Sequence, residues 1–252
     1  MTKIDIISGF LGAGKTTLIK KLIEEAFTGE KLVLIENEFG EIGIDGGFLK
    51  DSGINITEMN SGCICCSLVG DFGTALAEVL EKYAPDRIII EPSGVGKLSD
   101  VIKAVLGVKE KVAEDSVVLN SFTTVADATK CKMYMKNFGE FYNNQVEHAG
   151  TIVLSRTGNM KEDKLQACID LIRTQNTEAS IITTPWDQIN GKQILDAMEK
   201  KNDLVKELLE EEDVCPECGH HHEHGEECDH DHEHHHDHEH HHDHEHEHHH
   251  DH

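Results

Sequence analysis

Residues 9–16, GFLGAGKT, restrict the fold of this 252-residue chain more than any other feature. They match the pattern G-x-x-x-x-G-K-[ST] in full, with an apolar run before them at residues 3–8 and an amphipathic run after them at residues 16–27. In such a loop, glycines let backbone N–H groups wrap phosphate oxygens, and the positive N-terminus of the following helix faces the negative charge. The sequence therefore predicts a strand, a phosphate-binding loop and a helix in that order.

Each residue type in this loop has an expected role. Lys15 is expected to reach the β- and γ-phosphates, and the hydroxyl of Thr16 to hold Mg²⁺. The predicted nucleotide-binding residues of the loop are Gly9, Gly12, Ala13, Gly14, Lys15, Thr16 and Thr17. A glycine-rich turn that binds nothing is the alternative, and the strand and helix patterns on either side disfavour it.

Strand and helix patterns alternate along the rest of the chain. Short apolar runs predict strands at residues 3–8, 31–35, 54–58, 87–90, 117–119 with a continuation near Val125, 151–154 and 180–183. Apolar residues at helical spacing predict helices at residues 16–27, 72–83, 98–106, 138–148, 161–173 and 191–209. This alternation predicts an α/β fold, a P-loop NTPase with a mostly parallel sheet and helices on both faces.

A second acidic group follows the predicted strand at residues 87–90. Glu91 and Gly94 belong to the sequence Glu-Pro-Ser-Gly at the carboxyl end of that strand, where ligands bind in open α/β sheets. Phosphate cleavage needs an acid near Mg²⁺ and a contact to the γ-phosphate. We expect Glu91 to act on Mg²⁺ through water and the Gly94 N–H to contact the γ-phosphate. An ordinary strand end with a turn is the alternative.

Three of the eight cysteines, Cys63, Cys65 and Cys66, fall within four positions. Their C-x-C-C spacing is too tight for mutual disulfides without strain, but it suits one soft ion such as Zn²⁺, Ni²⁺, Co²⁺ or Cu⁺. Three protein ligands leave a fourth position open, which permits release of the ion. The alternative is a set of buried, inert cysteines, which is what we expect of the isolated Cys131 and Cys168.

The C-terminal segment, residues 215–252, holds 19 of the 20 histidines, 13 acidic residues and no Lys or Arg. Because it has almost no apolar residues, we expect an NTPase domain of residues 1–212 and a metal-binding tail of residues 213–252 that is disordered without metal. Neutral imidazole is a common metal ligand. The predicted ligands of the tail are Cys215, Cys218, His220, His221, His222 and Cys228. An acidic solubilising tail or an expression tag is the alternative.

The formal net charge of −25 argues against DNA, RNA or an anionic membrane as partner, since each would need a basic face. The N-terminus shows no charged leader followed by a long apolar run, and no stretch is long and apolar enough to span a membrane. We therefore expect a cytoplasmic protein. In that compartment thiols stay reduced, so clustered cysteines favour metal chemistry over disulfides.

Four motifs in order, GFLGAGKTTL, IENEFGEIGID, NSGCICCS and IIIEPSG, make the chain resemble the CobW family of P-loop GTPases over residues 3–200. This family is related to the HypB and UreG proteins, which handle nickel. The resemblance implies a GTP-hydrolysing metallochaperone that carries zinc, cobalt or nickel to a client metalloprotein, and it leaves a homodimer open. It also implies that the C-x-C-C thiols bind the metal and that residues 36–41 respond to the nucleotide. Glu38 or Glu41 would then be an added oxygen ligand or a partner of Mg²⁺.

The chain departs from the family pattern in the segment that reads guanine. The family usually has Asn/Thr-Lys-x-Asp after a strand, and here Ser155, Arg156, Thr157 and Gly158 stand in that place. We predict that Ser155 and Arg156 contact the nucleotide, whereas the aspartate that would accept hydrogen bonds from guanine N1 and N2 is missing. A pocket without that acceptor discriminates poorly against adenine, so GTP is expected from the resemblance and ATP stays an alternative. Many relatives also carry a further C-terminal domain, where this chain has a helix and the His-rich tail.

Three functions are compatible with these features. The first, which we predict, is a metallochaperone whose nucleotide cycle controls how tightly the thiols bind the metal ion. No arginine finger is identifiable, so unaided nucleotide hydrolysis should be slow. The second is a metal buffering or storage protein that relies on the tail, with a weakly active or vestigial NTPase domain. The third is an ATP-dependent insertase for a corrinoid or nickel enzyme.

Overall fold

The computed structural model describes residues 1–37, 54–59, 63–68, 72–110, 112 and 116–200, and for residues 37, 54–59, 63–68, 72, 74 and 75 it describes the backbone alone. All of these residues belong to the first of two compact units, Met1–Leu208. The second unit, Leu209–His252, lies outside the described residues. No helix in the described ranges is long and apolar enough to cross a membrane.

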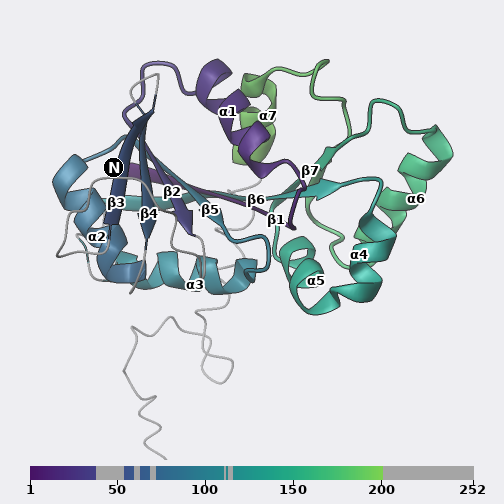
Figure 1. The fold of residues 1–252 in the computed structure, drawn as a ribbon, viewed down its shortest axis with the longest axis horizontal. Helices are drawn as coiled ribbons and strands as arrows, with labels where there is room; N and C mark the ends of the chain where they lie inside the picture. The colour runs from purple at the N-terminus through teal and green to yellow at the C-terminus, as the bar shows by residue number, and fades with distance from the viewer. Residues whose placement is uncertain (38–53, 60–62, 69–71, 111, 113–115, 201–252) are drawn as a thin grey trace, which may run out of the picture. The chain divides into compact units, whose positions relative to one another are not determined.

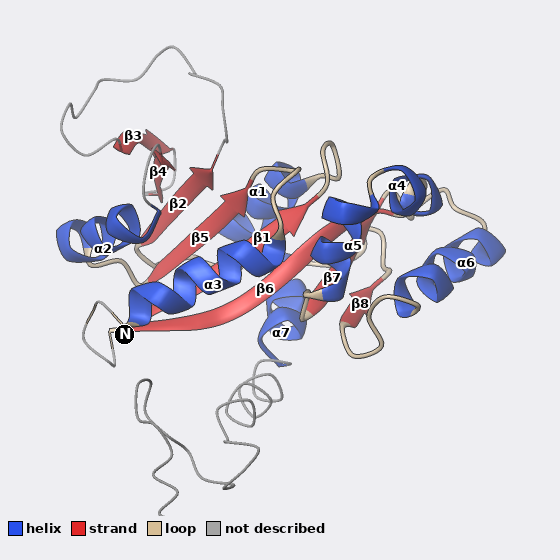
Figure 2. Ribbon diagram, turned by 90° about the horizontal axis from the view of Figure 1, so that it is seen from below, coloured by secondary structure: helices blue, strands red, loops and turns tan. Residues whose placement is uncertain are grey.

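The described strands form one eight-stranded sheet in the order β3-β4-β2-β5-β1-β6-β7-β8 (Figures 1 and 2). All neighbouring strands run parallel except the antiparallel pair β3 and β4. The strands are β1 Thr2–Gly9, β2 Leu32–Asn37, β3 Ile54–Met59, β4 Cys63–Leu68, β5 Arg87–Pro92, β6 Val117–Asp127, β7 Thr151–Ser155 and β8 Ser180–Ile182. The predicted α/β fold with a mostly parallel sheet is therefore confirmed.

Helices cover both faces of the sheet (Figure 1). Helices α1 and α7 pack on one face and the other five helices on the opposite face, each side with its own buried apolar layer. The helices are α1 Lys15–Glu25, α2 Phe72–Tyr83, α3 Leu98–Lys109, α4 Cys131–Asn137, α5 Gly139–Glu147, α6 Glu162–Arg173 and α7 Gly191–Lys200. Two layers of this kind explain why Ile88, Ile89 and Ile90 of β5 are all fully buried, since both sides of that strand are covered.

The sequence does not predict β4 or α4. The run CICCSL of β4 suggests a ligand cluster more than a strand, because cysteines do not show the β-branched pattern of a typical strand. Helix α4 has only seven residues, which is too short for a periodic signal. The helix predicted at residues 191–209 begins as expected at Gly191, and its part beyond Lys200 lies outside the described residues.

Strand β6 is a single strand of 11 residues, although the sequence predicts two pieces. Polar residues in its middle interrupt the apolar pattern. The structure pairs three of them: Asn120 and Ser121 donate hydrogen bonds to Asp5 of β1, and the Thr124 hydroxyl donates to the carbonyl of Gln145. The hydroxyl of Thr123 is buried without a hydrogen-bond partner among the described residues. Most of the polar side chains in the middle of the strand are therefore satisfied by partners from β1 and α5.

Candidate functional site

The phosphate-binding loop connects the end of β1 to the start of α1. Gly12 and Gly14 have φ angles of 71° and 110°, in the left-handed region that favours glycine. Gly9 has φ of 153°, and a Cβ at this position would lie only 2.5 Å from the carbonyl oxygen of Val125 on β6. The conformation and close packing of the loop therefore account for its three glycines, two of which belong to the pattern.

Lys15 is the first residue of α1 and folds back over the loop. Its Nζ donates to the carbonyl of Gly9 at 2.9 Å and lies 3.4 Å from the carbonyl of Phe10. Burial lowers the pKa of Lys15, and the carboxylate of Glu91 opposes part of that shift. The ammonium group is therefore held at the loop by carbonyl oxygens, in a position from which it can turn to a phosphate.

Thr16 and Glu91 meet although they come from different parts of the chain. Glu91 lies near the end of β5, beside β1 in the sheet, and the Thr16 hydroxyl donates to its Oε1 at 3.1 Å. A hydroxyl and a carboxylate are hard oxygen ligands, which Mg²⁺ prefers. The chemistry of this pair fits a magnesium ion next to bound phosphates.

Gly94 packs against the phosphate-binding loop. A Cβ at Gly94 would lie 2.7 Å from Leu11 Cδ2 and 2.8 Å from the Leu11 backbone nitrogen, so no side chain fits there without a shift of the backbone. The turn that holds Gly94 is fixed from behind by Gln145 of α5. The Nε2 of this buried amide donates to the carbonyls of both Gly94 and Gly96 at 2.9 Å. The sequence pattern does not indicate a role for Gln145, because nothing local distinguishes it from a surface glutamine.

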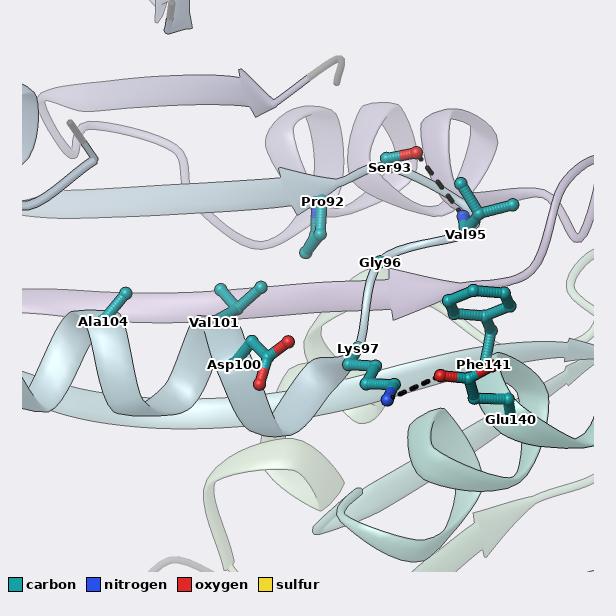
Figure 3. Close-up of a pocket in the computed structure, with 10 residues that line it drawn as sticks. All are labelled: Pro92, Ser93, Val95, Gly96, Lys97, Asp100, Val101, Ala104, Glu140 and Phe141. Atoms are coloured by element: carbon teal, nitrogen blue, oxygen red, sulfur yellow. Dashed lines mark hydrogen bonds and ion pairs between the residues drawn. The ribbon is translucent and has the colours of Figure 1, made fainter. Parts of the chain in front are cut away.

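A cavity of about 390 Å³ lies beside this turn, between α3 and α5 (Figure 3). Its walls include the apolar residues Pro92, Val101 and Phe141. Lys97 and Glu140 also line it, and their charged groups pair with each other at 2.9 Å. None of the predicted nucleotide-binding residues lines this cavity, so we do not assign the nucleotide to it.

A second cavity, of about 350 Å³, is lined in part by the phosphate-binding loop. It is lined by residues from three loops: the phosphate-binding loop, the segment after β7 and the segment after β8. The lining residues are Ala13, Gly14, Thr17, Ser155, Arg156, Thr157, Gly158, Pro185, Trp186 and Asp187. The predicted nucleotide contacts Ser155 and Arg156 therefore lie in one cavity with part of the phosphate-binding loop.

Two side chains at the end of β7, from its last residue and from the residue after it, connect this cavity to the phosphate-binding loop. Ser155 Oγ donates to the carbonyl of Ala13 at 2.6 Å, and Arg156 Nη2 donates to the carbonyl of Gly12 at 3.0 Å. Arg156 also pairs through Nη1 with buried Asp127 at 2.6 Å, at the end of β6. Its φ of 59° is strained for a residue with a side chain, and strain of this kind is concentrated at functional sites. Asp127 is an acid at the carboxyl end of a predicted strand, and this position could have indicated it as a candidate site residue from the sequence.

The backbone of the thiol motif lies two strands away from Glu91. Glu36 of β2 pairs with Ser67 of β4 on one side and with Glu91 of β5 on the other. Cys66 directly precedes Ser67, so it belongs to the adjacent row of the sheet. The fold thus places the backbone of the C-x-C-C motif on β4 and the acid of the phosphate site on β5, with the parallel strand β2 between them in register with both.

Most predicted metal ligands cannot be placed as side chains. The predicted ligands whose side chains lie outside the described residues are Cys63, Cys65, Cys66, Glu38, Glu41, Cys215, Cys218, His220, His221, His222 and Cys228. Among the side chains that the structure does describe, no group of three or more His, Cys, Asp or Glu residues is arranged to hold a metal ion. Cys131 and Cys168 are buried and free, which confirms the prediction that they are core residues.

A parallel sheet, a glycine loop folded around a lysine, and an acid at the end of the neighbouring strand define a P-loop nucleotide-binding domain. The chain belongs to the CobW/HypB/UreG family, whose nucleotide-binding domain matches residues 3–183. The resemblance to the CobW family drawn from the four motifs is therefore confirmed.

Three known proteins illustrate the relationship. The zinc chaperone YeiR of Escherichia coli is 29% identical over 76% of this chain and 57% of its own length, and the zinc chaperone CobW of a Sinorhizobium species is 34% identical over 88% and 68%. The crystal structure of the Zn(II)-bound YjiA GTPase from E. coli superposes with a TM-score of 0.59 at 27% identity, covering 76% of this chain and 62% of that one. The chain thus spans little more than half the length of YeiR.

Proposed function

We propose that this protein hydrolyses GTP and uses the nucleotide cycle to hold zinc and then release it to a client protein. The observation that carries the proposal is the row Ser67–Glu36–Glu91, which runs from the thiol strand to the acid at the phosphate-binding loop. Neighbouring strands lie about 4.8 Å apart, so the backbone beside Cys66 is only about 10 Å from Glu91. Strand β2 lies between the two and leads into residues 38–53, which contain Glu38 and Glu41.

The phosphate side of the proposed reaction follows from the loop geometry. Lys15 would exchange its carbonyl partners for phosphate oxygens, and the backbone of residues 12–14 would stabilise further charge. Thr16 and Glu91 would hold Mg²⁺, which, when bound, neutralises charge on the β- and γ-phosphates. The Gly94 N–H would contact the γ-phosphate. Loss of that phosphate would therefore remove a contact from the turn that Gln145 holds in place.

The metal side rests on thiol chemistry and on the relatives. Cys63, Cys65 and Cys66 would bind the ion as thiolates and leave one coordination position open for Glu38, Glu41 or a client ligand. Zinc is the cargo we propose, because relatives are named zinc chaperones and the YjiA structure is Zn(II)-bound. Cobalt and nickel would also accept sulfur ligands, and competition between the ions would rank them.

We also propose that residues 213–252 form a separate metal-binding tail beside a nucleotide-binding domain of residues 1–212. A flexible chain of this length spans roughly 35 Å r.m.s., so tethered ligands would raise the zinc concentration around the domain. The many histidines equally favour a second function, metal storage, in which the tail binds most of the metal. Reduced clustered thiols fit a cytoplasmic setting for either function.

The deciding experiment measures zinc affinity of the full chain in three states: without nucleotide, with a non-hydrolysable GTP analogue, and with GDP. We expect the affinity of the tight site to differ at least tenfold between the GTP-analogue and GDP states. The change should disappear in Cys65→Ser and persist in the matched control Cys168→Ala, whose thiol is buried in the core. Equal affinity in all three states would reject the chaperone function, and many bound zinc ions with zinc-insensitive hydrolysis would support storage.

A further inference from the structure

The cavity beside the phosphate-binding loop has the size and position of a site for the base and sugar of a nucleotide. Its volume of about 350 Å³ is within the range of ligand pockets. Ala13, Gly14 and Thr17 line it, so phosphates bound on the loop would place the rest of the nucleotide at this opening. The question is what distinguishes guanine from adenine here, since Gly158 occupies the position where the family has its aspartate.

We propose that Asp187, in the segment after β8, reads guanine in place of that aspartate. Its carboxylate would accept hydrogen bonds from the N1–H and the exocyclic amino group of guanine. This inference rests on the proposed function, since it names the substrate of the same nucleotide site.

The first observation is that Asp187 is the only acid among the described residues that line the cavity. It is exposed and makes no hydrogen bond or ion pair with any residue that the structure describes. The other charged group of the lining, Arg156, is already committed to Asp127 and to the carbonyl of Gly12. The cavity therefore contains one carboxylate whose hydrogen-bonding capacity is free for a ligand.

The second observation is that the position of Asp187 is fixed. A turn closes around it, because the backbone N–H of Gln188 donates to the carbonyl of Pro185 at 2.9 Å. The neighbouring Trp186 anchors the turn: its Nε1 donates to the carbonyl of Leu154 at 3.0 Å. Its ring lies against Gly14, where an added Cβ would be 3.1 Å from the ring. The segment that carries the carboxylate is thus packed on the phosphate-binding loop itself.

The third observation concerns Gly158. A Cβ at this position would meet only Pro185, at the ordinary contact distance of 3.7 Å from its Cβ. The position of the family aspartate and the turn that carries Asp187 are therefore direct neighbours in the wall of one cavity. An acid from either segment would face the same edge of a base. The segment after β8 therefore contributes the carboxylate that the segment after β7 lacks.

The chemistry of the two bases explains why a carboxylate would discriminate between them. Guanine presents two donors, N1–H and the amino group at C2, and both point at a single carboxylate. Adenine presents an acceptor at N1 and no amino group at C2, so it would leave the carboxylate without donors and oppose it with a lone pair. Charge-assisted hydrogen bonds of this kind, and the cost of leaving them unmade, correspond to at least about a tenfold preference for guanine.

The test is Asp187→Asn in the full chain, with the binding of GDP, ADP and xanthosine diphosphate measured by calorimetry in the presence of Mg²⁺. Xanthine carries a carbonyl at C2 where guanine has the amino group, and an asparagine amide can donate to that carbonyl. We expect the variant to bind GDP at least tenfold more weakly and xanthosine diphosphate more tightly than the unmodified protein does. ADP binding should not weaken, because the amide removes the repulsion between the carboxylate and the N1 lone pair of adenine. A merely structural role would not produce this exchange of preferences.

Two further variants sharpen the result. Asp196→Asn removes a carboxylate from an exposed position on α7 and should leave all three affinities unchanged. Adding Gly158→Asp to Asp187→Asn restores an acid to the neighbouring wall and should recover the preference for GDP. The Cβ of the added residue would make only an ordinary contact with Pro185 among the described residues. Unchanged GDP binding in Asp187→Asn, or an equal loss of all three nucleotides, would overturn the proposal.

The outcomes separate this inference from the proposed function. If the unmodified protein prefers GDP and Asp187→Asn leaves that preference intact, the assignment of Asp187 fails while GTP hydrolysis stands. If Asp187→Asn shifts the preference to xanthosine diphosphate but zinc affinity is the same in every nucleotide state, the base reader stands and the chaperone function fails. If no nucleotide binds to the unmodified protein, both fail.

Discussion

Thr16 and Glu91 lie 75 positions apart in the sequence, yet the hydroxyl of one donates to the carboxylate of the other at 3.1 Å. This contact joins the helix that follows the phosphate-binding loop to the end of β5. Strand β5 pairs with β2, and β2 pairs with β4, which carries the thiol motif. The contact therefore links the phosphate-binding loop to a second strand of the sheet besides β1.

The first prediction concerns this carboxylate. Glu91→Gln keeps the shape of the side chain and removes the charge that would face Mg²⁺, so we expect GTP turnover to fall about 100-fold, equivalent to about 2.7 kcal/mol in the barrier. Nucleotide binding measured in EDTA should change little, because the carboxylate would act through the ion. Steady-state hydrolysis across a Mg²⁺ titration checks this. Glu24→Gln, at an exposed position on α1, is the control, and equal turnover in the two variants would contradict the assignment.

The second prediction concerns the buried amide behind the Gly94 turn. Gln145→Leu removes the donor to two carbonyls and leaves them unpaired, which costs about 1–3 kcal/mol of stability. For a domain of this size the melting temperature should fall by roughly 2–10 °C. GTP turnover should fall more than GTP affinity, because we propose that the Gly94 turn contacts the γ-phosphate and not the base.

A thermal melt and a kinetic comparison of kcat with KM check the second prediction. Gln166→Leu on the exposed surface of α6 is the matched control, since it removes only the bond to Asp170. If Gln145→Leu has a lower melting temperature but hydrolyses GTP at the normal rate, the prediction about turnover is contradicted and the amide has a purely structural role.

The phosphate-binding loop could be predicted from the sequence because the pattern is local: its glycines, Lys15 and the helix after it are neighbours in the chain. The same holds for α2, whose amphipathic pattern predicts its bounds at residues 72–83, as observed. What the sequence could not supply is the set of contacts between distant segments. Ser155 reaches Ala13 across 142 positions, and no periodicity encodes such a contact.

The strand order was also beyond prediction. Alternating patterns indicate a parallel sheet, but they do not say that β2 lies between β4 and β5. The thiol motif therefore predicts soft-metal chemistry without predicting that its backbone pairs into the sheet near Glu91. In the same way, Gly158 predicts the loss of a guanine acceptor, whereas only the folded cavity places Asp187 beside that position.

A third prediction follows from the packing of Gly9. Gly9→Ala places a methyl group 2.5 Å from the carbonyl oxygen of Val125, a contact that only a shift of β6 or of the loop can relieve. We expect a loss of about 2–3 kcal/mol in the free energy of unfolding, together with loss of nucleotide binding. Gly107→Ala is the matched control, because nothing lies within 4 Å of its added Cβ in helix α3. It should stabilise the protein by about 0.5–1 kcal/mol, and urea titration of both variants checks the contrast.

The fourth prediction is a pH dependence at Glu199 of α7. Partial burial raises its pKa, but hydrogen bonds from Asn120 and Lys3 and the charges of Lys3 and Arg87 outweigh burial, so the net pKa is lowered. A carboxylate with a lowered folded pKa contributes stability above its unfolded pKa, near 4.3, and this contribution is lost as the pH falls through the folded value.

Glu199→Gln should therefore lower the free energy of unfolding at pH 7 by less than about 1 kcal/mol, since the side chain is partly exposed. The difference from the unmodified protein should shrink as the pH drops below about 4. Denaturant titrations at pH 7, 5 and 3.5 measure it. Asp196→Asn, on the same helix and without these partners, is the control. A difference between Glu199→Gln and the unmodified protein that grows on acidification would contradict the sign.

The last prediction concerns the tail. Truncation after Glu212 removes the 19 clustered histidines and three cysteines but leaves the phosphate-binding loop and the C-x-C-C motif in the chain. Because imidazole, thiolate and carboxylate groups all bind zinc, equilibrium dialysis should show several fewer ions per chain after truncation. One tight ion should remain, and Cys65→Ser in the truncated chain should remove it. GTP affinity should be the same in both lengths. An unchanged zinc stoichiometry would show that the tail gathers no metal, whereas loss of the tight ion with the tail would move the principal site from the C-x-C-C motif to residues 213–252.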